Sequence, residues 1–82
     1  MNGWIDHVVS TGISQVMITS HRGLQILNPS RVELRFYRDA AKEKRLFKIP
    51  QGFFELTFAN LDMSGELWVE ASDSATITIN IL

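Results

Sequence analysis

The chain has 82 residues, no cysteine, 45% apolar and 21% charged residues, and a formal net charge of −1. This length suits one domain, 1–82, with a small core, and the composition is that of a folded rather than a disordered protein. The lack of cysteine excludes disulfides and thiolate metal sites, and no run reaches the roughly 18 to 20 apolar residues of a membrane span. The first residues carry no basic leader. We therefore expect one globular domain, made in a cytoplasm, with no membrane partner.

Charge is distributed unevenly along the chain. Residues 1–48 hold all eight Lys and Arg and four of the nine acidic residues, whereas residues 49–82 hold the other five acidic residues and no cation. Two interpretations fit this pattern. Either the halves lie side by side and pair locally across strands, or a basic surface of one copy meets an acidic surface of the next.

The N-terminal part of the chain predicts an arm and a hairpin. Residues 1–12 form an N-terminal arm or a first edge strand, and residues 13–19 are expected to form a strand. The segment 20–23 ends in a glycine that can supply the positive φ of a tight turn, which predicts a hairpin between 13–19 and 24–27. The Asn-Pro-Ser segment 28–30 ends this hairpin because proline has no N–H to donate.

The clearest strand covers residues 31–38. Its side chains alternate between two faces, with Val32, Leu34 and Phe36 toward the core and Arg31, Glu33, Arg35 and Tyr37 toward water. Residues 39–45 are charged and too few for a stable helix, so we expect a loop or at most one helical turn. A short strand, 46–49, follows.

Three further strands are expected in the C-terminal part, at 53–59, 65–71 and 75–82. In the last of these, alternation places one set of residues on a core face: Ala75, Ile77, Ile79 and Ile81. If this strand is an edge, another subunit can continue the sheet from it. If it is central, contacts with another subunit must be made by the outward aromatic residues instead. The sequence leaves both arrangements open.

Short strands at intervals of about 8 to 12 residues, with turn residues between them, predict an all-β fold. We expect an antiparallel β-sandwich or small barrel of about seven strands. The alternative is a five-stranded oligonucleotide-binding barrel, which usually carries a helix between its third and fourth strands. Residues 39–45 are the only candidate for that helix.

Catalytic and metal-binding patterns are not expected. His7 and His21 lack the spacing of metal ligands, and neither a nucleophile turn nor a glycine-rich phosphate loop occurs. Glu66 and Glu70 lie about 13 Å apart along one strand, beyond the spacing of a glycosidase pair. The sequence therefore predicts no enzyme, no cofactor and no metal site.

A basic face offers one alternative function. Its candidate residues follow one another in the chain: Arg31, Arg35, Arg38, Lys44 and Arg45. With Tyr37 among them, they have the mixture of cations and aromatic rings that binds single-stranded nucleic acid. A sequence pI of about 6.0 and the acidic C-terminal half oppose this function.

Aromatic residues that do not fit the expected core are the candidate interface. They are Trp4, Tyr37, Phe53 and Trp68. Four such rings in a small chain predict a buried contact with another molecule, most simply a second copy, which would also enlarge a small core. Carbohydrate binding by Trp68 is a further alternative.

The segments Gly52-Phe53-Phe54-Glu55-Leu56 and Gly65-Glu66-Leu67-Trp68-Val69-Glu70-Ala71, followed by the Thr/Ile strand, resemble small all-β structural proteins of tailed bacteriophage virions. The resemblance covers roughly the last 30 residues. It implies a non-catalytic homo-oligomer, for which we expect a trimer, that docks on a larger assembly such as a phage capsid.

Overall fold

The computed structural model of the chain describes residues 4–52, 54–60 and 62–82. Within this range the regular structure consists of eight strands: β1 Trp4–Val9, β2 Gly12–Gln15, β3 Gly23–Asn28, β4 Leu34–Tyr37, β5 Arg45–Ile49, β6 Phe54–Ala59, β7 Trp68–Ala71 and β8 Ala75–Ile81. None of the described residues belongs to a helix with the length and apolar character needed to cross a bilayer.

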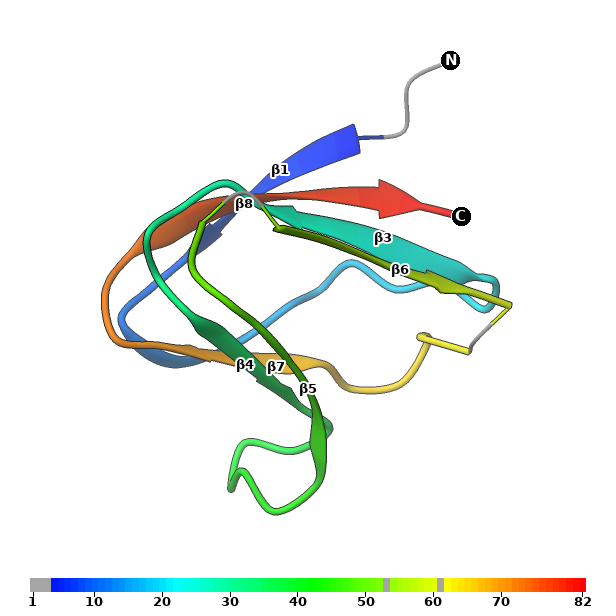
Figure 1. Cartoon of the computed structure of the whole chain (residues 1–82). Helices are drawn as coiled ribbons and strands as arrows, with labels where there is room; N and C mark the ends of the chain where they lie inside the picture. Colours follow the sequence, from blue (N-terminus) through cyan, green and yellow to red (C-terminus); the bar gives the residue numbers. More distant parts are fainter. Residues whose placement is uncertain (1–3, 53, 61) are drawn as a thin grey trace.

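The strands form two four-stranded antiparallel sheets that lie face to face (Figure 1). Sheet A has the order β1-β8-β3-β6, and sheet B has the order β2-β7-β4-β5. The pairs β1–β8, β2–β7, β3–β6 and β4–β5 form one long hairpin rolled onto itself, which is the topology of a jelly roll. The predicted all-β antiparallel sandwich is confirmed, with eight strands in place of about seven.

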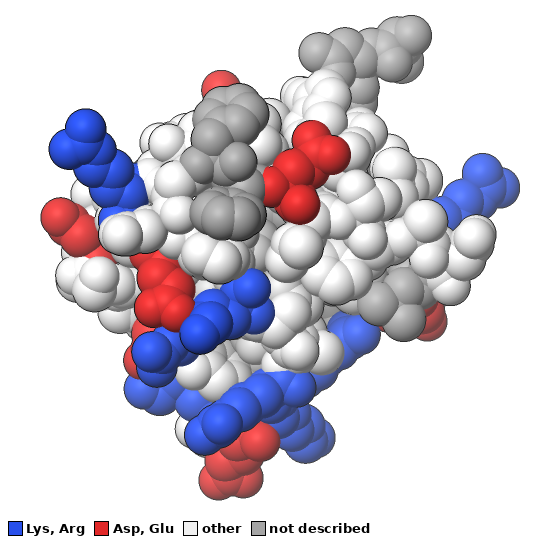
Figure 2. Space-filling view, viewed as in Figure 1, with Lys and Arg blue, Asp and Glu red and all other residues white. Residues whose placement is uncertain are grey.

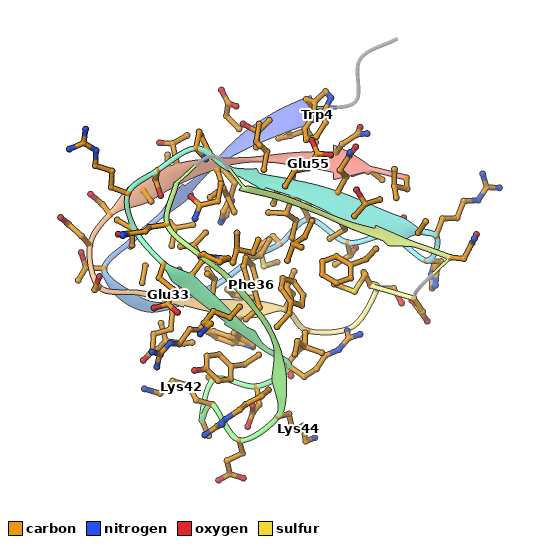
Figure 3. All side chains as sticks on the ribbon, viewed as in Figure 1. Trp4, Glu33, Phe36, Lys42, Lys44 and Glu55 are labelled. Atoms are coloured by element: carbon orange, nitrogen blue, oxygen red, sulfur yellow. The ribbon has the colours of Figure 1, made fainter. Side chains whose placement is uncertain are left out.

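The core lies between the sheets and contains the inward-facing half of each strand. In sheet A, Ile26 and Ile79 are directly opposite each other and fully buried. In sheet B, Phe36 stacks on Phe47 with ring centroids 4.6 Å apart, and Phe47 contacts Phe58 of sheet A at 4.3 Å. Figure 3 shows Phe36 pointing into the space between the sheets. These three rings close the sandwich on the side where β5 and β6 meet.

The predicted hairpin between residues 13–19 and 24–27 is wrong. β2 pairs with β7 in sheet B, whereas β3 lies between β8 and β6 in sheet A. Residues 16–19, which we call the strap, cross from one sheet to the other, and the Val16 N–H donates to the Leu67 carbonyl at 2.7 Å. A turn that contains glycine serves such a crossing as well as it serves a hairpin, so local signals could not separate the two.

The C-terminal strand β8 is central in sheet A. It pairs with β1 from Trp4↔Asn80 to Val9↔Ala75, and it pairs with β3 on its other side. The edge strands of sheet A are therefore β1 and β6. Because β8 is paired on both sides, another subunit cannot continue the sheet from it, and the alternative in which this strand is an edge is wrong.

Among the described residues, Asn28 is the one polar side chain within the buried core. Its Nδ2 donates to the Val32 carbonyl at 2.9 Å and to the Pro50 carbonyl at 3.1 Å. Its Oδ1 accepts hydrogen bonds from the N–H and the hydroxyl of Ser30, at 3.1 and 2.6 Å. Asn28 thus joins the connection after β3 to the segment after β5.

Asn28→Leu is expected to lower the free energy of unfolding by about 2 to 3 kcal/mol, because the fully buried amide and its hydrogen bonds to the Val32 and Pro50 carbonyls and to Ser30 are lost. Urea denaturation measures this loss. Asn80→Leu is the matched control, since Asn80 lies on the outer face of sheet A and donates to Gln25 alone. Its expected cost is within about 0.5 kcal/mol. Equal losses in the two variants would contradict the role assigned to Asn28.

Candidate interaction surfaces

The outer face of sheet B gathers the cations that lie within strands. Two cross-strand rows cover it: Ile13, Glu70, Arg35 and Lys48, and beside them Gln15, Trp68, Tyr37 and Arg45. The strands of sheet A contain no Lys or Arg. Figure 2 shows Lys and Arg side chains crowded over the end of the molecule that carries β5 and the β4–β5 loop.

A hollow of about 470 Å³ opens over β4 and β5, where a β-bulge shifts the register of the two strands. Arg35, Arg45 and Lys48 line it. Glu33 lies 3.3 Å from Lys48 and 3.9 Å from Arg35, but ion pairs this exposed are weak. The Arg45 side chain makes no ion pair or hydrogen bond with any described residue. The hollow therefore presents positive charge that the fold does not neutralise.

The predicted basic face is assembled only in part. Two of its members line the hollow, Arg35 and Arg45. Arg38 turns toward the opposite loop, where its Nη2 donates to the Asp62 carbonyl at 3.1 Å. The other two are exposed in loops and lie outside the hollow, Arg31 and Lys44. Neighbours in the sequence thus point to different parts of the surface.

Tyr37 lies on the outer face of sheet B, as predicted, but it is only 7% exposed. Its hydroxyl donates to Glu70 Oε1 at 3.2 Å, and Lys42 Nζ lies 2.6 Å from Glu70 Oε2. Lys42 belongs to the β4–β5 loop and Glu70 to β7, on the other side of β4, so the loop reaches back over Tyr37. The hydrogen bond with Lys42 lowers the pKa of Glu70, and the same bond raises the pKa of Lys42. Tyr37 therefore anchors this loop and offers little contact surface.

Glu70→Gln is expected to lower the urea midpoint at pH 7, because Lys42 and Tyr37 lose a charged acceptor. A carboxyl whose pKa is lowered by folding stabilises the protein above its ordinary pKa of 4.5, and this stabilisation disappears as the pH falls through the folded-state pKa. The difference between wild type and variant should therefore vanish in acid. Glu66→Gln is the control, since the Glu66 side chain is exposed and makes no hydrogen bond or ion pair within the described part of the chain, and it should leave the midpoint unchanged at both pH values. A pH-independent difference for Glu70→Gln would contradict the ion pair.

The remaining aromatic candidates are covered in part or lie outside the described residues. Trp68 is half-buried on the outer face of sheet B, and its indole N–H is buried without a partner among the described residues. In this arrangement that N–H is not offered to a sugar. Trp4 is half-buried on the outer face of sheet A, opposite Asn80 (Figure 3). Phe53 lies outside the described residues.

The outer face of sheet A carries a polar ladder without cations. Asn80 donates to Gln25 at 3.2 Å, Gln25 donates to Glu55 at 2.8 Å, and Thr78 donates to Asp6 at 3.2 Å. The charged residues of these strands, Asp6 and Glu55, are both acidic. The two outer faces of the sandwich thus differ in charge, while ion pairs such as that at Glu70 link the basic and acidic halves locally. The local pairing expected from the first interpretation is present at Glu70. A basic and an acidic face, which the second interpretation requires, are present as well.

Exposed aliphatic side chains occur along the side of the sandwich opposite the Phe36, Phe47 and Phe58 rings. On this side β1 and β2 are the edge strands of the two sheets, and the strap follows β2. Four large apolar side chains of these segments are exposed, and we call them the apolar edge: Ile5 (42%), Val8 (68%), Ile13 (37%) and Met17 (74%). Single exposed apolar residues are ordinary, but four of them along two open strand edges make this side of the sandwich a candidate contact surface.

Two polar atoms beside the apolar edge are buried and lack a hydrogen-bond partner among the described residues. They are His7 Nε2 in β1 and Ser14 Oγ in β2. His7 is opposite the fully buried Ile77, so it belongs to the inner face of sheet A. Burial lowers the pKa of the His7 imidazole, which keeps it neutral at pH 7.

The apolar edge is the surface that sequence reasoning missed, because that reasoning selected aromatic residues. One signal was available in residues 13–19. Ile13 and Met17 share one face of the predicted strand, and Val16 and Ile18 share the other. A strand that is apolar on both faces is either buried on both or exposes one of them, and here Val16 is buried while Met17 is exposed.

The described residues contain no group of three or more His, Asp or Glu side chains placed to hold a metal ion. No protein-family model matches the chain, and comparisons with curated proteins and with solved structures gave no match. The surfaces described above therefore carry the functional argument.

Proposed function

We propose that this chain is a non-catalytic structural protein that self-associates and acts through surface contacts. The virion component implied by the phage resemblance, a capsid decoration or accessory protein, is the specific form of this proposal. The observation that carries it is the apolar edge, where four exposed aliphatic side chains lie beside two unpaired strand edges. Proteins usually block such edges with charge, proline or a covering segment, and an edge left open pairs with another chain.

The fold is compatible with this proposal. Jelly rolls occur in viral capsid proteins, and also in lectins and cupins. Because one fold serves many functions, the apolar edge supports this proposal more directly than the topology does. A domain of 82 residues also gains from burying additional apolar area in an assembly.

Val8→Glu is expected to convert an oligomer into a monomer, because it places a charge on the open edge of β1. Light scattering coupled to gel filtration, at high micromolar protein and low salt, measures the mass. Val8 is 68% exposed, so the variant should remain folded. Thr57→Glu is the matched control, since Thr57 is exposed on β6, the other edge strand of sheet A. A strictly monomeric wild type would overturn the proposal.

Single-stranded nucleic-acid binding is the second candidate, supported by the hollow over β4 and β5. Its cations suit phosphate groups, and the Arg45 side chain pairs with none of the residues that the structure describes. Stacking of bases has less support, because Phe36 and Tyr37 are buried and Phe47 lies between Phe36 and Phe58.

An oligonucleotide titration at two salt concentrations tests this candidate. Arg45→Ala should weaken salt-sensitive binding, whereas Arg31→Ala, outside the hollow, should weaken it less. Absence of salt-sensitive binding by the wild-type chain would remove nucleic acid from consideration.

A further inference from the structure

The four edge strands differ in their protection against pairing with another chain. β5 carries Arg45 and Lys48, contains a bulge and is followed by Pro50, and each of these features blocks edge pairing. β6 lies against β5 through Phe47 and Phe58. β2 has only four residues. β1 has six residues, keeps an unbroken register with β8 and contains no Pro, Lys or Arg. Among the described strands, β1 is therefore the least protected edge.

β1 also exposes apolar side chains on both of its faces. Ile5 is opposite Ile79 on the inner face and is 42% exposed, and Val8 on the outer face is 68% exposed. His7 lies on the inner face, with its Nε2 buried and unpaired. A strand added beside β1 would cover Ile5 and Val8 together and would pair the main-chain groups that residues 5–9 turn away from β8.

The sequence of β1 restricts how two copies can pair symmetrically. Directly opposite residues of an antiparallel pair point to the same face, so odd-numbered residues must meet odd-numbered ones and even must meet even. A pair centred on Asp6 places two carboxylates opposite each other, which is unfavourable. A pair centred on His7 places Ile5 opposite Val9 of the second copy and Asp6 opposite Val8. The inner face of the second arrangement is apolar on both sides of His7.

We propose that a second copy of this chain pairs with β1 in antiparallel orientation about a two-fold axis at His7. The two A sheets, of four strands each, then form one continuous sheet of eight strands. This inference rests on the proposed self-association and names the surface that makes it. A symmetric contact of this kind closes after two copies, so it leaves both outer faces and the β4–β5 hollow free for a larger assembly.

The absence of cysteine from the chain allows a direct test by cross-linking. In His7→Cys the two new thiols face each other across the axis, where opposed Cβ atoms lie about 4.5 to 5.5 Å apart, close enough for a disulfide after a small shift. Mild oxidation should therefore convert most of this variant into a dimer on a non-reducing gel. Thr57→Cys, exposed on the opposite edge of the same sheet, is the control and should remain a monomer.

A second pair of variants tests the register and leaves the inner face intact. Asp6→Cys and Val8→Cys, once mixed, should cross-link to each other, since Asp6 is opposite Val8 in the proposed pair. Each variant alone should cross-link much less, because its own copies lie on a diagonal, about 7 to 8 Å apart and beyond disulfide reach. Equal cross-linking within and between the two variants would overturn the register.

The outcomes separate this inference from the proposed function. A dimer by light scattering, with the His7→Cys and mixed cross-links, supports both. A dimer or trimer without these cross-links overturns β1 pairing and leaves self-association standing. A wild-type chain that is monomeric at high micromolar concentration overturns both.

Discussion

Deletion of residues 79–82 is expected to abolish the cooperative folded state. It removes Ile79, which is fully buried opposite Ile26, from the middle of sheet A. It also removes the bond from the Leu82 N–H to β3 and the bond from the Ser20 hydroxyl to the Leu82 carbonyl. Loss of one buried isoleucine side chain costs about 2 to 5 kcal/mol. The whole stability of a chain of this length is about 4 to 12 kcal/mol, so the combined loss leaves little or none of it.

Circular dichroism during heating and urea titration measures this loss. Ile79→Val is the graded control: it should keep a cooperative transition and cost about 0.5 to 1.5 kcal/mol. Ile81→Ala should lower the free energy of unfolding less than Ile79→Ala does, because Ile81 is 44% exposed. The alternation of side chains along β8 had predicted a core position for it. A truncated chain with an unchanged melting temperature would mean that the end of β8 is dispensable.

The strands themselves were predictable from the sequence, because a strand with one buried and one exposed face has alternating apolar and polar residues. Ala75, Ile77 and Ile79 are buried as the pattern requires. Leu34 and Phe36 in β4 follow the same rule. The strand ends were less accurate, since β4 covers Leu34–Tyr37 within the predicted 31–38. Alternation continues into turns that make no ladder hydrogen bonds, so the pattern alone overextends a strand.

The order of strands was not predictable, because it depends on pairs far apart in the chain. β1 and β8 pair across almost the whole sequence, from Trp4↔Asn80 to Val9↔Ala75. Residue 20 pairs with residue 63, and not with the strand that the turn at 20–23 predicts. Turn residues indicate where the chain changes direction, but they do not indicate with which strand the next segment pairs. The central position of β8 could therefore come only from the structure.

The candidate site was predicted less well than the fold, because exposure depends on what covers a side chain. The alternation of side chains along β4 places Tyr37 on the outer face of sheet B, but the β4–β5 loop reaches over it to Glu70 and buries it. Arg38 follows Arg35 closely in the chain and still turns to another loop. Val8 and Met17 are plain aliphatic residues whose importance arises from their places on an edge strand and on the strap.

Gly23→Ala is expected to lower the free energy of unfolding by about 3 kcal/mol or more, the sum of backbone strain and overpacking. Gly23 has a φ of 114° and is opposite Ala59 in the β3–β6 pair. A Cβ at this position would lie 1.6 Å from the carbonyl oxygen of Phe58 and 2.8 Å from its carbonyl carbon. Both atoms belong to the backbone, so no change of rotamer relieves the clash. β3 and β6 would have to separate where they begin to pair.

Alanine variants of two other glycines, measured in the same urea titration, distinguish the cost of the steric clash from the cost of backbone strain. Gly12 has a φ of 93° but no atom within 4 Å of an added Cβ, so Gly12→Ala carries the strain alone, about 1 to 2 kcal/mol. Gly65 has no positive φ, and its added Cβ would meet only Arg38 Nη1 at 3.0 Å, the end of a flexible side chain. Gly65→Ala should therefore cost little. Equal losses for Gly23→Ala and Gly12→Ala would mean that the approach of the Phe58 carbonyl to Gly23 adds nothing, and that β3 needs this glycine for its φ alone.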